Sequence, residues 1–176
     1  MITFEQCWEY AAQLEGFDKV VNHPKDPGGR TAWGITERDH PDLWVGGPPT
    51  KEAALARWER NYWHPRYNSL TDVRIGRELL EAGLLCGRHR AIKFLQKAYN
   101  AIAYDGDSVL AEDGVYGPTT EAVIVAFMSR GVAARDALLN AANGEQYIYF
   151  KSVGNRAFMR GWASKRITAS ATTPGK

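Results

Sequence analysis

Four polar side chains between residues 15 and 36 have the chemical types that acid-catalysed bond cleavage requires. They are two carboxyl groups and two hydroxyl groups, on Glu15, Asp26, Thr31 and Thr36. Glu15 ends an apolar helical pattern, so its carboxylate would meet the negative end of the helix dipole. That position disfavours the ionised form and so favours a general acid at neutral pH. An exposed glutamate near a helix end is also common, so position alone leaves both interpretations open.

A stiff loop with the sequence "HPKDPGG" follows at residues 23–29. Its two prolines fix φ, whereas its two glycines permit positive φ. Such a loop loses little entropy on ordering and could hold Asp26 at a defined distance from Glu15. In the structural alternative, Asp26 only initiates a turn before Pro27.

The hydroxyl groups of Thr31 and Thr36 could each hold a water molecule. Thr36 has a structural alternative as a helix cap, with Asp39 at the N3 position. Trp33 lies between the two threonines in sequence. Its ring is a candidate wall that desolvates Glu15 and a candidate substrate contact.

A second polar and aromatic cluster, "YWHPRY", begins at Tyr62 and Trp63. Aromatic faces stack on the apolar C–H face of a pyranose, so either side chain could contact a sugar. The structural alternative is that these rings pack in the core. The pattern leaves both interpretations open.

These side chains must be positioned by helices, because helical periodicity runs through most of the chain. We expect an all-α fold without a convincing strand pair. The predicted helices begin near residues 3, 36, 50, 72, 88, 118, 132 and 155. Thr3 with Gln6 and Thr50 supply N-cap signals, and Pro118 occupies an N1 position. The small polar residues 168–176 predict a disordered tail.

The composition excludes several classes of protein. The chain has 176 residues, 44% hydrophobic, and a net charge of +2. No apolar run reaches the roughly 18 residues of a membrane helix. The N-terminus lacks a basic segment before an apolar one, so we expect synthesis in the cytoplasm without a signal peptide. Four basic residues lie close together near the C-terminus: Arg156, Arg160, Lys165 and Arg166. A solvated helix face explains them better than attraction to an anionic surface such as a cell wall or nucleic acid, and no nucleic-acid-binding motif appears.

The cysteine and histidine spacings point to no metal or cofactor. Cys7 and Cys86 lie in helical apolar patterns, which favours buried thiols over a disulfide. His40, His64 and the remaining histidines lack metal-ligand spacing. We therefore expect no cofactor and no metal.

The residues around Glu15 resemble the signature of glycoside hydrolase family 108, muramidases often found as phage-type endolysins. The matching positions are Glu15-Gly16, Val21-Asn22, Asp26-Pro27-Gly28-Gly29, Thr31 and Gly34-Ile35-Thr36. The chain departs from the signature at Phe17-Asp18, where the family has Gly-Tyr, and at His23, where it often has Asp. It also lacks the Asn that many members carry near Leu85.

Residues 91–122 resemble a compact peptidoglycan-binding helical module. The matching positions are Leu95-Gln96, Asn100, Asp113-Gly114, Gly117, Thr120 and Ala122. In the structural alternative these residues only form a turn and a helix entry. The two resemblances together imply a lysozyme-like catalytic lobe over 1–88 and a small helical lobe over 89–167.

The family resemblance implies a lysozyme-type muramidase that acts on peptidoglycan glycan strands. Glu15 would be the general acid, Asp26 the second carboxylate, and Thr31 or Thr36 the residue that positions water. It further implies release from the cytoplasm to the cell wall, as for a prophage endolysin. A lytic transglycosylase and a non-catalytic wall-binding protein remain the alternatives.

Overall fold

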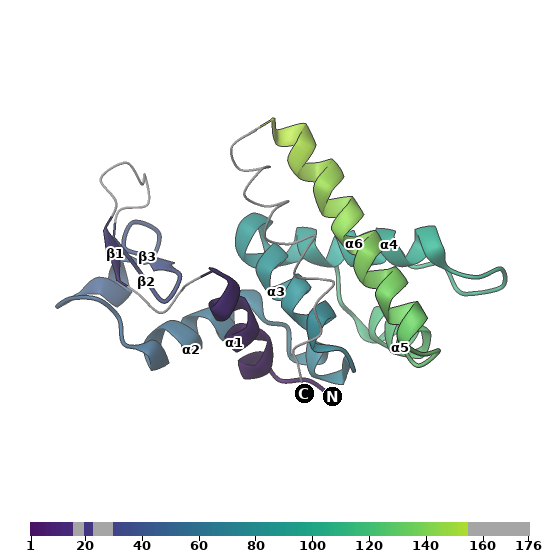
Figure 1. Cartoon of the computed structure of the whole chain (residues 1–176), viewed down its shortest axis with the longest axis horizontal. Coiled ribbons are helices and arrows are strands. Elements are labelled where there is room, and N and C mark those ends of the chain that lie inside the picture. Colours follow the sequence, from purple (N-terminus) through teal and green to yellow (C-terminus); the bar gives the residue numbers. More distant parts are fainter. Residues whose placement is uncertain (16–19, 23–29, 155–176) are drawn as a thin grey trace.

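A computed structural model describes residues 1–15, 20–22 and 30–154 (Figure 1). Within these residues most of the chain is helical, so the predicted all-α class is confirmed as a mainly helical fold. The α-helices are α1 (Phe4–Glu15), α2 (Lys51–Tyr62), α3 (Val73–Cys86), α4 (Arg88–Ile102), α5 (Pro118–Met128) and α6 (Val132–Val153). Two 3₁₀ helices, η1 (Pro41–Trp44) and η2 (Pro65–Ser69), flank α2.

A small antiparallel sheet joins the helices, and the expectation of no strand pair was wrong. Its strands are β1 (Val21–Asn22), β2 (Arg30–Ala32) and β3 (Ile35–Thr36), in the order β1-β2-β3. Strands this short carry too few residues for a period-two pattern to stand out. The turn between β2 and β3 has positive φ at Trp33 (53°) and Gly34 (75°), as a two-residue hairpin of the primed type requires.

The predicted helix starts coincide with side-chain caps. The backbone N–H of Thr3 donates to Gln6 Oε1 (3.0 Å), and the N–H of Gln6 donates back to Thr3 Oγ1 (3.3 Å). Thr50 Oγ1 accepts from the N–H of Ala53 (3.3 Å) at the start of α2. These bonds satisfy donors that a helix N-terminus leaves without an intrahelical partner.

The expectation of an α-helix that begins at residue 36 was wrong. Thr36 belongs to β3, and residues 37–39 form a turn before η1 begins at Pro41. The predicted cap is present, because Thr36 Oγ1 accepts from the N–H of Asp39 (3.3 Å). The turn does not continue as an α-helix, since a residue before proline, here His40, is disfavoured in the α region.

One continuous hydrophobic cluster fills the molecule. It extends from Ile2 in the N-terminal segment to Ala142 in α6 and includes both predicted lobes. Figure 1 shows α3 between α1 and the helices α4 and α6, with the sheet beyond α1 on the far side. At Gly76 the helices α1 and α3 come so close that an added Cβ would lie 2.7 Å from Cys7 Sγ of α1.

The remaining expectations concern the C-terminal residues, membrane-spanning helices and the two cysteines. The helix predicted from residue 155, its four basic residues and the tail 168–176 lie outside the described residues. Among the helices that are described, none combines the length and the apolar character needed to cross a bilayer. Both cysteines are free thiols, as the sequence predicts; Cys7 is buried as expected, whereas Cys86 is only half-buried.

Candidate active site

Glu15 is the last residue of α1, which agrees with the helix-end position predicted from the sequence. Its side chain lies outside the described part of the structure, and so does the whole of Asp26. The last turn of α1 carries no basic residue that would offset the negative end of the helix dipole. The backbone of residue 15 therefore lies at the negative end of the α1 dipole.

Thr31 and Thr36 face each other across the sheet. They are direct partners in the β2–β3 register, so their side chains share one face. The neighbouring pair, Ala32 with Ile35, is fully buried and marks the opposite face as the core side. Both threonines are half-buried. The sheet thus presents two adjacent hydroxyl groups on the face turned away from the core.

The two hydroxyl groups differ in their partners. Thr36 Oγ1 donates to Asp39 Oδ2 (2.8 Å) and accepts from the N–H of Asp39, so it serves as a turn cap. The Thr31 hydroxyl has no hydrogen-bond partner among the residues that the structure describes. Thr31 is therefore the better candidate for holding a water molecule, and the cap role accounts for Thr36.

Trp33 occupies the tip of the β2–β3 hairpin in a left-handed conformation. Such a backbone costs about 1–3 kcal/mol for a residue other than glycine. The carbonyl oxygen of Trp33 accepts from Trp58 Nε1 (2.9 Å), and this bond from a fully buried ring fixes the turn. Lys51 Nζ lies 5.9 Å from the Trp33 ring and 5.3 Å from the Trp8 ring. The backbone that carries the half-buried Trp33 ring is thus held in place at the edge of the sheet.

Tyr62 and Trp63 have different roles although they are adjacent. Trp63 is only 4% exposed, and its Nε1 donates to Asn68 Oδ1 (2.9 Å). It packs edge-on against Tyr67 at 5.2 Å, so the structure favours the core alternative over a sugar contact for Trp63. Tyr62, at the end of α2, is half-buried, and burial raises the pKa of its hydroxyl above the usual value. Tyr62 keeps an accessible part and remains a candidate contact.

The motif residues in α4 and those in the segment after it form an internal clasp, in which α4 side chains bind that segment. Gln96, which is fully buried, donates from Nε2 to Asp113 Oδ1 (2.9 Å) and accepts at Oε1 from the N–H of Gly114 (2.7 Å). Asn100 both donates to the carbonyl of Leu110 and accepts from its N–H, each at 2.9 Å. These bonds support the structural alternative for these residues, and peptidoglycan binding by this lobe stays a prediction.

The histidines have partners other than a metal. His40 Nδ1 lies 3.0 Å from Arg57 Nη1, and His64 Nδ1 accepts from the N–H of Arg66 (3.2 Å). Burial lowers the pKa of both rings below the usual value. Across the described ranges, no group of three His, Cys, Asp or Glu side chains gathers as a metal site would require.

Sequence reasoning missed three buried charges on α3: Arg77, Glu78 and Glu81, which are 0%, 3% and 2% exposed. In a helix sequence, charges one and four residues apart usually indicate a solvated face. The available signal was the nearly unbroken apolar run on both sides of them, which favours burial of the whole helix.

Comparisons with known proteins agree with this geometry. Residues 9–87 match the family model described as glycosyl hydrolase 108. The whole chain is similar to the solved structure of Brucella abortus SagA, with 26% sequence identity and a TM-score of 0.66. That similarity covers 93% of this chain and 92% of the other. No curated protein matches the sequence. The family resemblance read from the residues around Glu15 is thereby confirmed.

Proposed function

We propose that this chain, a glycoside hydrolase with a family 108 domain over residues 9–87, is an N-acetylmuramidase. Its substrate is the β-1,4 bond between N-acetylmuramic acid and N-acetylglucosamine in peptidoglycan. One observation carries the proposal: the matched span holds Glu15 at the end of α1 together with the sheet that bears Thr31. The similarity to SagA over nearly the whole of both chains supports it.

In this mechanism Glu15 protonates the oxygen of the leaving sugar while an oxocarbenium-like ring develops. The position at the negative end of α1 favours the protonated acid before the reaction. Asp26 is the proposed second carboxylate. A separation of about 5–5.5 Å between the two carboxyl groups gives retention, and about 6.5–9.5 Å leaves room for water and gives inversion. Thr31, with a hydroxyl not used inside the described structure, is the proposed water ligand.

The half-buried rings at the sheet and at the end of α2 supply the proposed sugar contacts. Trp33 and Tyr62 are the candidates, because Trp58 holds the Trp33 backbone and packs against the Tyr62 ring, and both residues are only half-buried. An apolar ring face can cover the C–H face of a pyranose, and a tyrosine hydroxyl adds a polar partner. Trp63 is left out of the site, since it is buried.

The test is mass spectrometry of purified peptidoglycan after digestion by the wild type and by Glu15→Gln. Glu9→Gln is the matched control, because Glu9 is an exposed glutamate on the same helix. New reducing N-acetylmuramic ends from the wild type and the control, but not from Glu15→Gln, support the proposal. Anhydro ends would make the protein a lytic transglycosylase. Binding to peptidoglycan without any products would make it a non-catalytic wall protein.

We also propose that the enzyme reaches the wall as an endolysin does, after release from the cytoplasm. Cells that express it in the cytoplasm should keep a constant optical density until the inner membrane is permeabilised, and should then lyse. Glu15→Gln supplies the control for lysis by permeabilisation alone. Lysis that starts without permeabilisation would contradict this route.

A further inference from the structure

The buried charges on α3 are the largest polar feature that the proposed reaction does not use. Arg77, Glu78 and Glu81 lie within two turns of one helix and are essentially inaccessible to water. Removing a charge from water costs several kcal/mol even after relaxation, and a buried ion pair often stabilises no better than apolar residues of similar volume. Stability alone therefore explains this cluster poorly.

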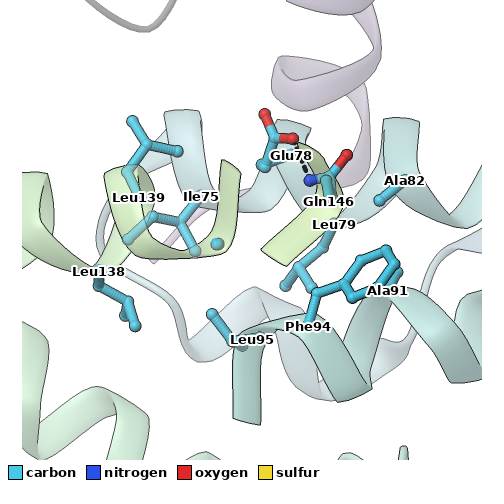
Figure 2. A pocket seen from close by; sticks show the side chains of 11 residues that line it. Ile75, Glu78, Leu79, Ala82, Ala91, Phe94, Leu95, Leu138, Leu139 and Gln146 are labelled. Carbon is cyan, nitrogen blue, oxygen red and sulfur yellow. Dashed lines mark hydrogen bonds between the residues drawn. The ribbon is translucent and has the colours of Figure 1, made fainter. Parts of the chain in front are cut away.

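The three charges contact one another and a residue of α6. Arg77 Nη2 lies 3.4 Å from Glu78 Oε2, and Arg77 Nε lies 3.8 Å from Glu81 Oε2. Gln146 of α6 donates from Nε2 to Glu78 Oε1, and Figure 2 shows this pair at the wall of an apolar cavity between α3, α4 and α6. Glu78 is thus held from the α6 side, which leaves Arg77 and Glu81 for the other side of α3.

The other side of α3 faces α1. The guanidinium carbon of Arg77 lies 4.6 Å from the centre of the Tyr10 ring, which is a stacking distance for a cation on an aromatic face. Nearer the start of both helices, Cys7 Sγ lies 3.8 Å from the carbonyl oxygen of Val73. Later residues of α1 thus contact later residues of α3, so the two helices run in the same direction where they pack.

Glu81 comes one helical turn after Arg77, which corresponds to an advance of about 6 Å along the axis. The same advance along α1 from Tyr10 leads into the turn that ends at Glu15. The turn of α3 that bears Glu81 is thus the one next to the C-terminal turn of α1.

Arg77 also has N–H groups that the cluster does not use. The last carbonyl groups of a helix lack intrahelical partners and favour a nearby cation, and the last turn of α1 contains no basic residue of its own. Nε and Nη1 of Arg77 make no hydrogen bond within the described residues. Two carboxylates offset the charge of this guanidinium, so Arg77 offers rigidly held N–H donors beside α1 and no net positive charge.

We propose that Arg77 and Glu81 are positioning residues that fix the last turn of α1, and with it the place of Glu15. The inference rests on the proposed muramidase function. Neither residue needs to touch the substrate. A small displacement of a catalytic group can cost about 100-fold in rate without weakening substrate binding. The expected signature is therefore a loss of kcat at an unchanged KM.

The experiment replaces the cluster by neutral residues of similar volume in the triple variant Arg77→Met/Glu78→Gln/Glu81→Leu. Because no charge is left unpaired, the Tm should stay within about 4 °C of the wild type. On soluble glycan strands released from peptidoglycan, we expect kcat to fall about tenfold or more and KM to change less than about twofold. A wild-type kcat, or a raised KM at constant kcat, would overturn the proposal.

Two further variants keep the test decisive. If the triple variant does not fold, Glu81→Gln, which keeps size and hydrogen-bonding atoms, takes its place with the same two criteria. Arg130→Met is the matched control, because it breaks a surface pair with Asp107 (2.6 Å) far along the chain and should leave kcat and KM unchanged. A wild type without activity would refute the muramidase proposal itself, whereas active wild type and fully active variants refute only the positioning role.

Discussion

The Gln96 clasp provides a stability prediction that the structure allows us to quantify. Gln96→Met keeps the length of the side chain but removes its bonds to Asp113, Gly114, Val115 and Thr120. A net hydrogen bond contributes about 0.5–1.5 kcal/mol, and a buried donor left unpaired costs about 1–3 kcal/mol. The largest single loss is at the N–H of Gly114, because this buried donor would lose its 2.7 Å bond to Gln96. We expect a loss of about 2–4 kcal/mol in the free energy of unfolding.

The assay is urea unfolding at equilibrium, followed by circular dichroism. A fall in the midpoint at constant m-value measures lost stability without a change of the unfolded state. Lys97→Met is the control, since Lys97 neighbours Gln96 on α4 but pairs at the surface with Glu145 (3.8 Å) and should cost less than about 1 kcal/mol. Equal midpoints for the two variants would refute the reasoning that the clasp holds the segment after α4. At urea concentrations below its unfolding midpoint, Gln96→Met should be as active as the wild type, because the clasp contacts none of the proposed catalytic residues.

Three further predictions concern single residues. Thr31→Val should lower kcat by about tenfold or more, whereas Thr36→Ser, which keeps the capping hydroxyl, should leave it near the wild type in the same reducing-end assay; equal effects would contradict the different roles of the two hydroxyls. Tyr62→Ala should raise KM for glycan strands at nearly constant Tm, and Trp63→Ala should instead destabilise by about 3–5 kcal/mol in thermal unfolding, since it empties a buried site. Burial raises the pKa of the Cys7 thiol to about 12. The folded state therefore favours the neutral thiol, and its stabilising contribution is complete below about pH 8.5 and falls by about 1.4 kcal/mol per pH unit from there towards pH 12; a Cys7→Ala protein should lack this slope in urea titrations.

The sequence predicted the elements whose ends carry chemical signals. Thr50 and Pro118 mark helix starts that the structure reproduces, because a cap or an N1 proline acts locally. The sheet was missed because its pairing depends on a hairpin turn with positive φ at Trp33, a residue that carries no such preference. Local patterns cannot indicate a conformation that a distant partner, here the Trp58 N–H, holds in place.

The candidate site, like the fold, could be predicted only in part from the sequence. Family signature residues identified Glu15, Thr31 and Thr36, but only the register and the Asp39 bonds separate the water candidate from the cap. Adjacent aromatic residues at a helix end, Tyr62 and Trp63, could not be ranked without knowing which one turns into the core.

The continuous core affects how such enzymes can be recombined. The family match ends at Gly87, the residue between α3 and α4. The hydrophobic face that α3 presents there is covered by α4 and α6, through residues such as Leu95 and Leu138. The boundary of the matched family is thus not a boundary of folding. Chimeras that join residues 1–87 to a foreign module would leave this face exposed and prone to aggregation. Fusions placed after α6 would keep it closed.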